Sequence, residues 1–289
     1  MGKTTRGAPG CVARVYAMQM QGVASCDCGA SSQLADKRLQ HESVYSSLLA
    51  TVSFCLTDYD HVLLDMNGTF LFDFDKFGPE QDFGSTYVSL GYRGLTPAEA
   101  QAHVRRAYDY LAVRYIDETY YDSFPSVTRA LRASGGEQLT DQTIEKLVDT
   151  FAVHEFGVLP QGHKEALTRL AQIRPVSVLS NLWAPKQRWL AAFEAWGIAD
   201  LFDALHFSSD GASMKPHPTF FDQALRAIWA KNPTARVVHV GDSYRCDVAG
   251  ALGAGIDAVW LSEQREVGSR EQGLVARFPD FISFVEALD

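Results

Sequence analysis

The fold is indicated first by residues 61–69, HVLLDMNGT, in which a short apolar run leads to Asp65 and then to Gly68 and Thr69. An apolar run that ends in a polar residue is typical of a parallel strand covered on both faces. Asp65 is therefore expected at the end of a strand, just where the chain must turn. By itself this pattern is weak, because an aspartate at a strand end is commonly only a cap or turn residue.

Four more runs of the same kind follow, separated by helical stretches, at residues 175–181, 204–209, 236–242 and 257–262. The alternation predicts an α/β fold with a Rossmann-like three-layer core and a parallel sheet. Two of the runs also end in chemically useful residues, Ser180 with Asn181 and Asp242. Because ligands bind beyond the carboxyl ends of the strands in open parallel sheets, we expect these residues to share one site with Asp65.

Between residues 76 and 159 the strand pattern gives way to helical patterns. The segment Thr96-Pro97-Ala98-Glu99 combines an N-cap, a proline and a capping-box glutamate, and predicts a helix to about residue 116. A second helix is expected over residues 139–156, with Thr140 as its cap. We predict that residues 51–75 and 160–289 form the core and that residues 76–159 form a mostly α-helical inserted domain. Seven of the eleven tyrosines fall in this insertion, where aromatic rings more often pack a small core than line a pocket.

Composition narrows the class of protein. With 289 residues and 46% hydrophobic residues, the chain can form one sizeable core plus a smaller module. A formal charge of -9 and a pI near 5.4 argue against nucleic-acid binding, and no apolar run reaches the roughly 20 residues that span a bilayer. A small molecule is therefore the expected partner; the oligomeric state is not readable.

The cysteines and the first residues bear on location. The five cysteines are few, odd in number and mostly far apart, which suits a reducing compartment and predicts a cytoplasmic protein. Residues 1–50 are rich in scattered small and polar residues, so we expect a disordered leader. Because the stretch is also basic and poor in acids, a transit peptide is the alternative.

Three further motifs carry groups suited to catalysis. Residues 178–181, VLSN, place a hydroxyl and an amide at a strand end, and residues 214–221, MKPHPTFF, hold Lys215 in a shape fixed by two prolines. Residues 240–247, VGDSYRCD, contain Asp242 and Asp247, and small residues follow over 250–255. Paired carboxylates at the mouth of an apolar strand suit Mg²⁺, which prefers oxygen ligands.

Together with residues 65–69, these motifs resemble, in order, the four active-site motifs of the haloacid dehalogenase superfamily, over about residues 60–289. The resemblance implies that the helical insertion is a cap domain closing over the site, and that Asp65 is a nucleophile. It implies that the phosphoryl group is held by Ser180, Asn181 and Lys215, of which Lys215 also reduces repulsion between anions. It further implies a Mg²⁺ site made by Asp65, the backbone carbonyl of Asn67, Asp242 and, through water, Asp247.

Asn67 departs from the family pattern, because the family's phosphatases carry a second aspartate there as general acid and base. An amide cannot exchange a proton near neutral pH. We therefore expect a Mg²⁺-dependent phosphatase of a small phosphorylated metabolite with weakened or specialised acid–base catalysis. Asp73 or Asp75 could replace the lost carboxylate, although charges on a solvated loop are the simpler interpretation of both.

Two other functions remain open. The dehalogenase and phosphonatase branches of the superfamily also lack the second aspartate, so the chain could cleave a carbon–halogen or phosphonate bond. A near-complete site without its proton shuttle would also suit a catalytically impaired protein that binds a phosphorylated metabolite.

Overall fold

The computed structural model describes residues 54–135, 139–263 and 274–288; the predicted leader, residues 1–50, lies outside them. The described residues form a six-stranded sheet in which every pair is parallel, in the order β3-β2-β1-β4-β5-β6. The strands are β1 (His61–Leu64), β2 (Val176–Ser180), β3 (Ala204–Phe207), β4 (Val237–Gly241), β5 (Asp257–Leu261) and β6 (Leu274–Phe278). The predicted α/β fold is confirmed, and the five apolar runs become β1 to β5.

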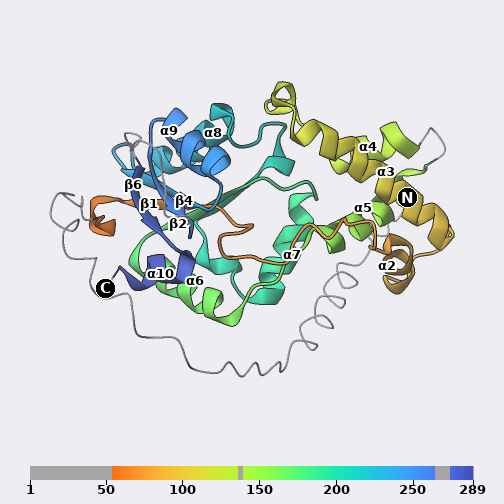
Figure 1. Ribbon diagram of the computed structural model, residues 1–289, viewed down its shortest axis with the longest axis horizontal. Coiled ribbons are helices and arrows are strands. Elements are labelled where there is room, and N and C mark those ends of the chain that lie inside the picture. The colour runs from red at the N-terminus through yellow and green to blue at the C-terminus, as the bar shows by residue number, and fades with distance from the viewer. Residues whose placement is uncertain (1–53, 136–138, 264–273, 289) are drawn as a thin grey trace, which may run out of the picture.

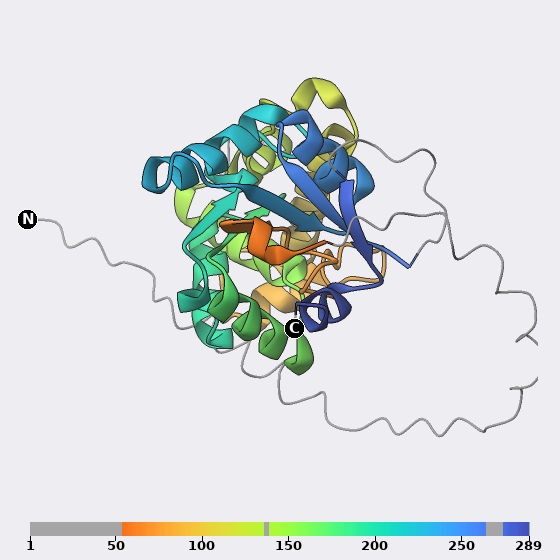
Figure 2. The same cartoon turned by 90° about the vertical axis from the view of Figure 1, so that its left-hand side faces the viewer.

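Helices cover both faces of the sheet (Figure 1, Figure 2). One face packs against α6 (Gln161–Ile173), α7 (Lys186–Trp196) and α10 (Phe281–Glu286). The other packs against α8 (Pro218–Lys231), α9 (Gly250–Gly253) and the preceding π-helical turn η5 (Tyr244–Ala249). Val62 and Leu64 point to the first cluster and Leu63 to the second. Because successive strand residues alternate between the faces, residues 62–64 of β1 must all be apolar.

The inserted region folds into α2 (Phe83–Ser89), α3 (Pro97–Tyr115), α4 (Val127–Gly135) and α5 (Asp141–Glu155), at the right of Figure 1. The predicted capping box closes α3: the Glu99 N–H donates to Thr96 Oγ1 at 3.3 Å and the Thr96 N–H to Glu99 Oε2 at 2.7 Å. Thr140 caps α5 by accepting from the Thr143 N–H. Short 3₁₀ turns complete the described chain: η1 (Leu56–Asp58), η2 (Glu118–Tyr120), η3 (Ala199–Leu201) and η4 (Ser208–Asp210).

The helices α2 to α5 have a hydrophobic cluster of their own, to which Met214 is the one fully buried contributor from outside residues 77–151 among the described residues. The tyrosines of the insertion are buried in this cluster or packed against it. Two linkers join this module to the sheet and run side by side, with paired backbone hydrogen bonds between Phe72 and Val158. The predicted boundaries at residues 75/76 and 159/160 are not tested further and stay a prediction.

No helix within the described ranges combines the length and apolar character needed to cross a bilayer. The predicted cytoplasmic location stays a prediction.

Candidate active site

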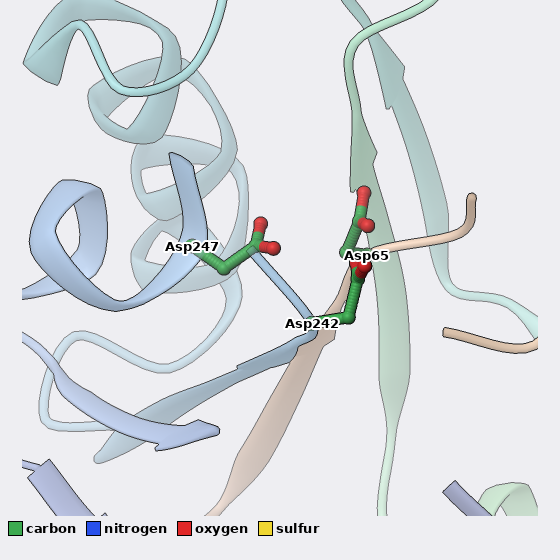
Figure 3. A group of neighbouring side chains, drawn as sticks. All are labelled: Asp65, Asp242 and Asp247. Carbon is green, nitrogen blue, oxygen red and sulfur yellow. The ribbon is translucent and has the colours of Figure 1, made fainter. Parts of the chain in front are cut away.

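The candidate site lies where the chain leaves the middle of the sheet. Strands β1 and β4 are neighbours in the middle of the sheet. The chain continues from β1 to β2 on one side of this pair and from β4 to β5 on the other. At such a switch point, a crevice is expected at the carboxyl ends of the strands. Asp65 follows β1, Asp242 follows β4, and Asp247 lies on η5 one turn later. Figure 3 shows the three carboxylates together, and one oxygen from each lies within 4.8 Å of the others.

Lys215 joins two of these carboxylates. Its Nζ donates to Asp65 Oδ1 and to Asp247 Oδ1, both at 2.6 Å, and all three side chains are buried. Burial opposes the charge of Lys215, but the carboxylates of Asp247 and Asp65 prevail and raise its pKa above the ordinary value. Burial raises the pKa of Asp65. For Asp247, burial acts in the same direction, but Lys215 and His239 outweigh it and lower the pKa.

A divalent cation fits this donor set. Three carboxylates face one lysine, so the cluster carries excess negative charge when ionised. Burial, and then the charges of Asp65 and Asp247, raise the pKa of Asp242 to about 7, so a neighbouring cation would favour the ionised form of this carboxyl group. The amide oxygen of Asn67 is also buried without a hydrogen-bond partner within the described chain. A site made only of oxygen donors suits a hard ion such as Mg²⁺.

Gly68 lets the first motif approach the fourth. It has a φ of +81°, and a Cβ placed on it would lie 2.4 Å from Asp242 Oδ2. That distance is far below van der Waals contact, so any side chain would displace the carboxylate. Glycine is therefore required here both for the backbone conformation and for the space.

We expect Gly68→Ala to weaken both folding and Mg²⁺ binding. Gly91→Ala is the matched control, because Gly91 has a φ of +80° and open space around its missing Cβ. Both variants should lose about 1–2 kcal/mol of unfolding free energy from the left-handed backbone, as measured in urea. Only Gly68→Ala should also lose about tenfold or more in Mg²⁺ affinity by calorimetry, because it moves a ligand. Equal Mg²⁺ affinities in the two variants would contradict this placement of Asp242.

Ser180 and Asn181 reach the same site by different contacts. Ser180 Oγ donates to Asp65 Oδ1 at 3.0 Å. The side chain of Asn181 holds the backbone of Lys215: its Nδ2 donates to the Lys215 carbonyl at 2.9 Å, and its Oδ1 accepts from the Lys215 N–H at 2.8 Å. The predicted phosphate-binding role of Asn181 is not tested by these contacts, but its side chain positions Lys215, which was not predicted.

Three more residues near the site were not predicted. His239 on β4 is fully buried and its Nε2 lies 3.0 Å from Asp247 Oδ1; a histidine inside the apolar run VVHVG was a usable signal. Tyr115, at the end of α3, packs edge-on against Trp183, two residues beyond Asn181, with ring centroids 5.5 Å apart. Glu155, at the end of α5, accepts from the N–H groups of Trp183 at 2.6 Å and Ala184 at 2.7 Å. Neither Tyr115 nor Glu155 is marked by any motif.

The two candidate replacement carboxylates differ. Asp73 lies on the surface in an ion pair with Lys76 at 3.2 Å. Asp75, like Asp73, is exposed and has a left-handed φ, of +53° against +51° for Asp73. The surrounding protein raises its pKa to about 6, although the residue keeps contact with solvent. Its charge acts on both Glu155 and the Tyr115 hydroxyl. Asp75 is thus the one of the pair that faces the boundary between the sheet and the helical module.

The family profile of haloacid dehalogenase-like hydrolases matches residues 59–255, well over half of the chain. The protein belongs to this family of hydrolases, as the four motifs predicted.

The individual relatives either match only part of this chain or share about a fifth of its residues. The pyrimidine 5'-nucleotidase YjjG of Escherichia coli is 33% identical over 88 residues, which are 30% of this chain and 37% of that protein. The structure of a 2-haloacid dehalogenase from Pseudomonas syringae pv. Tomato is 20% identical, covers 80% of this chain and 98% of its own, and superposes with a TM-score of 0.53. A HAD phosphatase from Thermococcus onnurineus is 19% identical over 79% of this chain and 97% of its own, with a TM-score of 0.50. At such identities the two structures support the fold alone.

Proposed function

We propose that the protein is a Mg²⁺-dependent phosphatase of a small phosphorylated metabolite, with Asp65 as nucleophile. The observation that supports this most is the buried Lys215 between Asp65 and Asp247, with Asp242 beside them. A lysine in contact with both a nucleophile and a second carboxylate neutralises charge where an anionic substrate must approach. The nucleotidase activity of the relative from Escherichia coli supports a phosphate ester as the substrate class.

The chain's own residues would carry two displacements. In the first, Asp65 attacks phosphorus, the bond to the leaving oxygen breaks, and a phosphoaspartate forms. In the second, water attacks that phosphorus and Asp65 is released. Lys215 and the Ser180 hydroxyl hold Asp65 in place. Asp65, Asp242, Asp247 and the Asn67 carbonyl would hold Mg²⁺, which, when bound, offsets the negative charge of the transferring group.

Asn67 weakens both proton transfers, because it can neither protonate the leaving oxygen nor deprotonate water. Positioned acid–base groups contribute about 10²- to 10⁴-fold to rate. We therefore infer that good leaving groups, as in aryl and acyl phosphates, are cleaved best and that the phosphoaspartate accumulates. Asp75 is the candidate for any remaining proton transfer, because its N–H donates to the Glu155 carbonyl at 3.3 Å and so places it next to the end of α5.

A substrate panel tests this function. Purified protein with and without Mg²⁺ is assayed for phosphate release from phosphorylated metabolites, aryl phosphates and acyl phosphates, and for chloride release from 2-haloacids. We expect Mg²⁺-dependent phosphate release, fastest from acyl and aryl phosphates, and no chloride. Chloride release without Mg²⁺ would favour a dehalogenase instead, and tight binding of phosphorylated compounds without any product would favour a binding protein.

A further inference from the structure

His239 is a fully buried imidazole that reaches from the sheet to the fourth motif. It lies in the middle of β4, and its Nε2 is 3.0 Å from Asp247 Oδ1. Asp247 forms an ion pair with Lys215, and an ionised carboxylate can only accept hydrogen bonds. His239 Nε2 must therefore carry a proton and donate the hydrogen bond to Asp247.

This hydrogen bond is the one polar contact that the His239 imidazole makes within the described residues. The other ring nitrogen, Nδ1, is buried there without a hydrogen-bond partner, and the Phe221 ring packs edge-on against the imidazole, with ring centroids 5.3 Å apart. Burying a polar nitrogen without a partner is unfavourable. An apolar side chain in the run VVHVG would avoid this penalty, so the contact with Asp247 is what the imidazole adds.

The Asp247 carboxylate is held on three sides. Its Oδ1 accepts from Lys215 Nζ at 2.6 Å and from His239, and its Oδ2 accepts from the Ser243 N–H at 2.8 Å. A Cβ on Gly241 would lie 2.5 Å from Oδ2, so the carboxylate packs directly against the backbone of β4. A carboxylate has about four acceptor positions. One position therefore remains, and it is what Asp247 can offer to Mg²⁺ or to a water molecule bound to the ion.

Of these three donors, His239 is the one that belongs to the sheet. Ser243 caps the same turn on which Asp247 lies, so its N–H moves with the carboxylate. Lys215 reaches Asp247 through a long side chain that also serves a second carboxylate. Val248 packs the turn against the sheet, but this apolar contact does not orient the carboxylate. His239, on a middle strand, therefore ties the orientation of Asp247 to the most rigid part of the fold.

We propose that His239 is a positioning residue that orients the Asp247 carboxylate for Mg²⁺ binding. The inference rests on the Mg²⁺ site of the proposed function but not on the reaction, because metal binding can be measured without substrate. Hydrogen-bond partners behind a metal ligand fix its orientation, and their loss typically weakens metal binding by about 10- to 100-fold. Without His239, the carboxylate can turn about its contact with Lys215 and loses its fixed direction toward the ion.

His239→Leu tests the proposal, because it removes the donor and keeps an apolar side chain in its place. His61→Leu is the matched control: His61 is buried on the same face of the neighbouring strand β1, at the opposite end of the sheet, and its Nε2 lies 2.9 Å from Ser177 Oγ. By calorimetry without substrate, we expect His239→Leu to weaken Mg²⁺ binding by about 10- to 100-fold. His61→Leu should keep the wild-type affinity. Equal affinities in the two variants would overturn the proposal.

A conservative variant separates orientation of the carboxylate from general loosening. His239→Gln keeps an N–H donor at a similar reach, so its Mg²⁺ affinity should return to within a few-fold of the wild type. Cooperative unfolding in urea shows that both His239 variants are folded. If His239→Gln then binds Mg²⁺ as weakly as His239→Leu, the hydrogen bond is not the cause of the loss and the proposal is wrong.

A double-mutant cycle traces the effect to Asp247. Asp247→Ala removes the carboxylate that His239 holds, so adding His239→Leu to it should weaken Mg²⁺ binding no further. Additive losses would show that His239 acts by another route and would contradict the proposal. If Asp247→Ala fails to fold, the leucine and glutamine variants of His239 remain decisive.

The same measurements separate this inference from the proposed function. A wild type that binds Mg²⁺ with the predicted difference between the variants, but releases no phosphate, would refute the phosphatase reaction alone. Equal Mg²⁺ affinities in the wild type and His239→Leu, with phosphate release intact, would refute the positioning role alone. A wild type that binds no Mg²⁺ would refute both.

Discussion

Replacing Asn67 by aspartate is expected to raise the turnover of alkyl phosphates by about 10²- to 10⁴-fold, the usual contribution of positioned acid–base groups. No other substitution is required, because Asp65, Lys215, Asp242 and Asp247 already lie together. The new carboxylate would protonate the leaving oxygen and then deprotonate water. The measurement is kcat for alkyl and aryl phosphates in both proteins at saturating Mg²⁺.

The dependence on the leaving group distinguishes proton transfer from tighter metal binding. A restored acid helps poor leaving groups most, so the gain should be larger for alkyl than for aryl phosphates. An equal gain for both classes of substrate would indicate that the added negative charge acts through tighter metal binding instead. Asn67 precedes Gly68, and Asn-Gly sequences are prone to deamidation. The deamidated fraction of the wild type must therefore be measured by intact mass, and the activity must not rise with that fraction. No gain for any substrate would contradict the account of Asn67.

Replacing Asp65 by asparagine is expected to reduce phosphate release to background, a loss of at least about 10³-fold, because an amide cannot form the phosphoaspartate. The variant should fold, since burial already disfavours the charged form of Asp65 and Lys215 keeps Asp247 as a partner. Asp73→Asn is the matched control, because this substitution removes only an exposed ion pair with Lys76. Exposed ion pairs contribute little to the free energy of unfolding. It should keep wild-type turnover. Unchanged turnover in Asp65→Asn would remove the proposed mechanism.

Much of the fold could be predicted because buried parallel strands and capped helices have clear local patterns. The runs at residues 61–65 and 236–242 place apolar residues on both faces of the sheet, and Thr96 and Glu99 predict the start of α3. Strand β6 was missed because it lies at the edge of the sheet and is only partly buried, with a charged Arg277 inside it. Edge strands are covered on fewer sides, so their sequences carry a weaker pattern.

The candidate site could be predicted only where a residue belongs to a motif at a strand end. Asp65, Asp242 and Lys215 meet because parallel strands bring their carboxyl ends together. The contacts of Tyr115 and Glu155 could not be predicted, because Tyr115 packs on the Trp183 ring and Glu155 bonds to backbone N–H groups, all on a loop distant in sequence. Such contacts depend on how the helical module docks, which no periodicity encodes.

We infer that Asp65 is a working nucleophile and that asparagine at position 67 removes only proton transfer. This inference is tested most directly by mixing the protein with Mg²⁺ and an acyl phosphate, quenching in acid and measuring intact mass. The wild type is expected to gain the mass of one phosphoryl group on Asp65. The label should be weaker in Asn67→Asp, which hydrolyses it faster, and absent in Asp65→Asn. Phosphate release by a wild type that never carries this group, with equal release by Asp65→Asn, would contradict it.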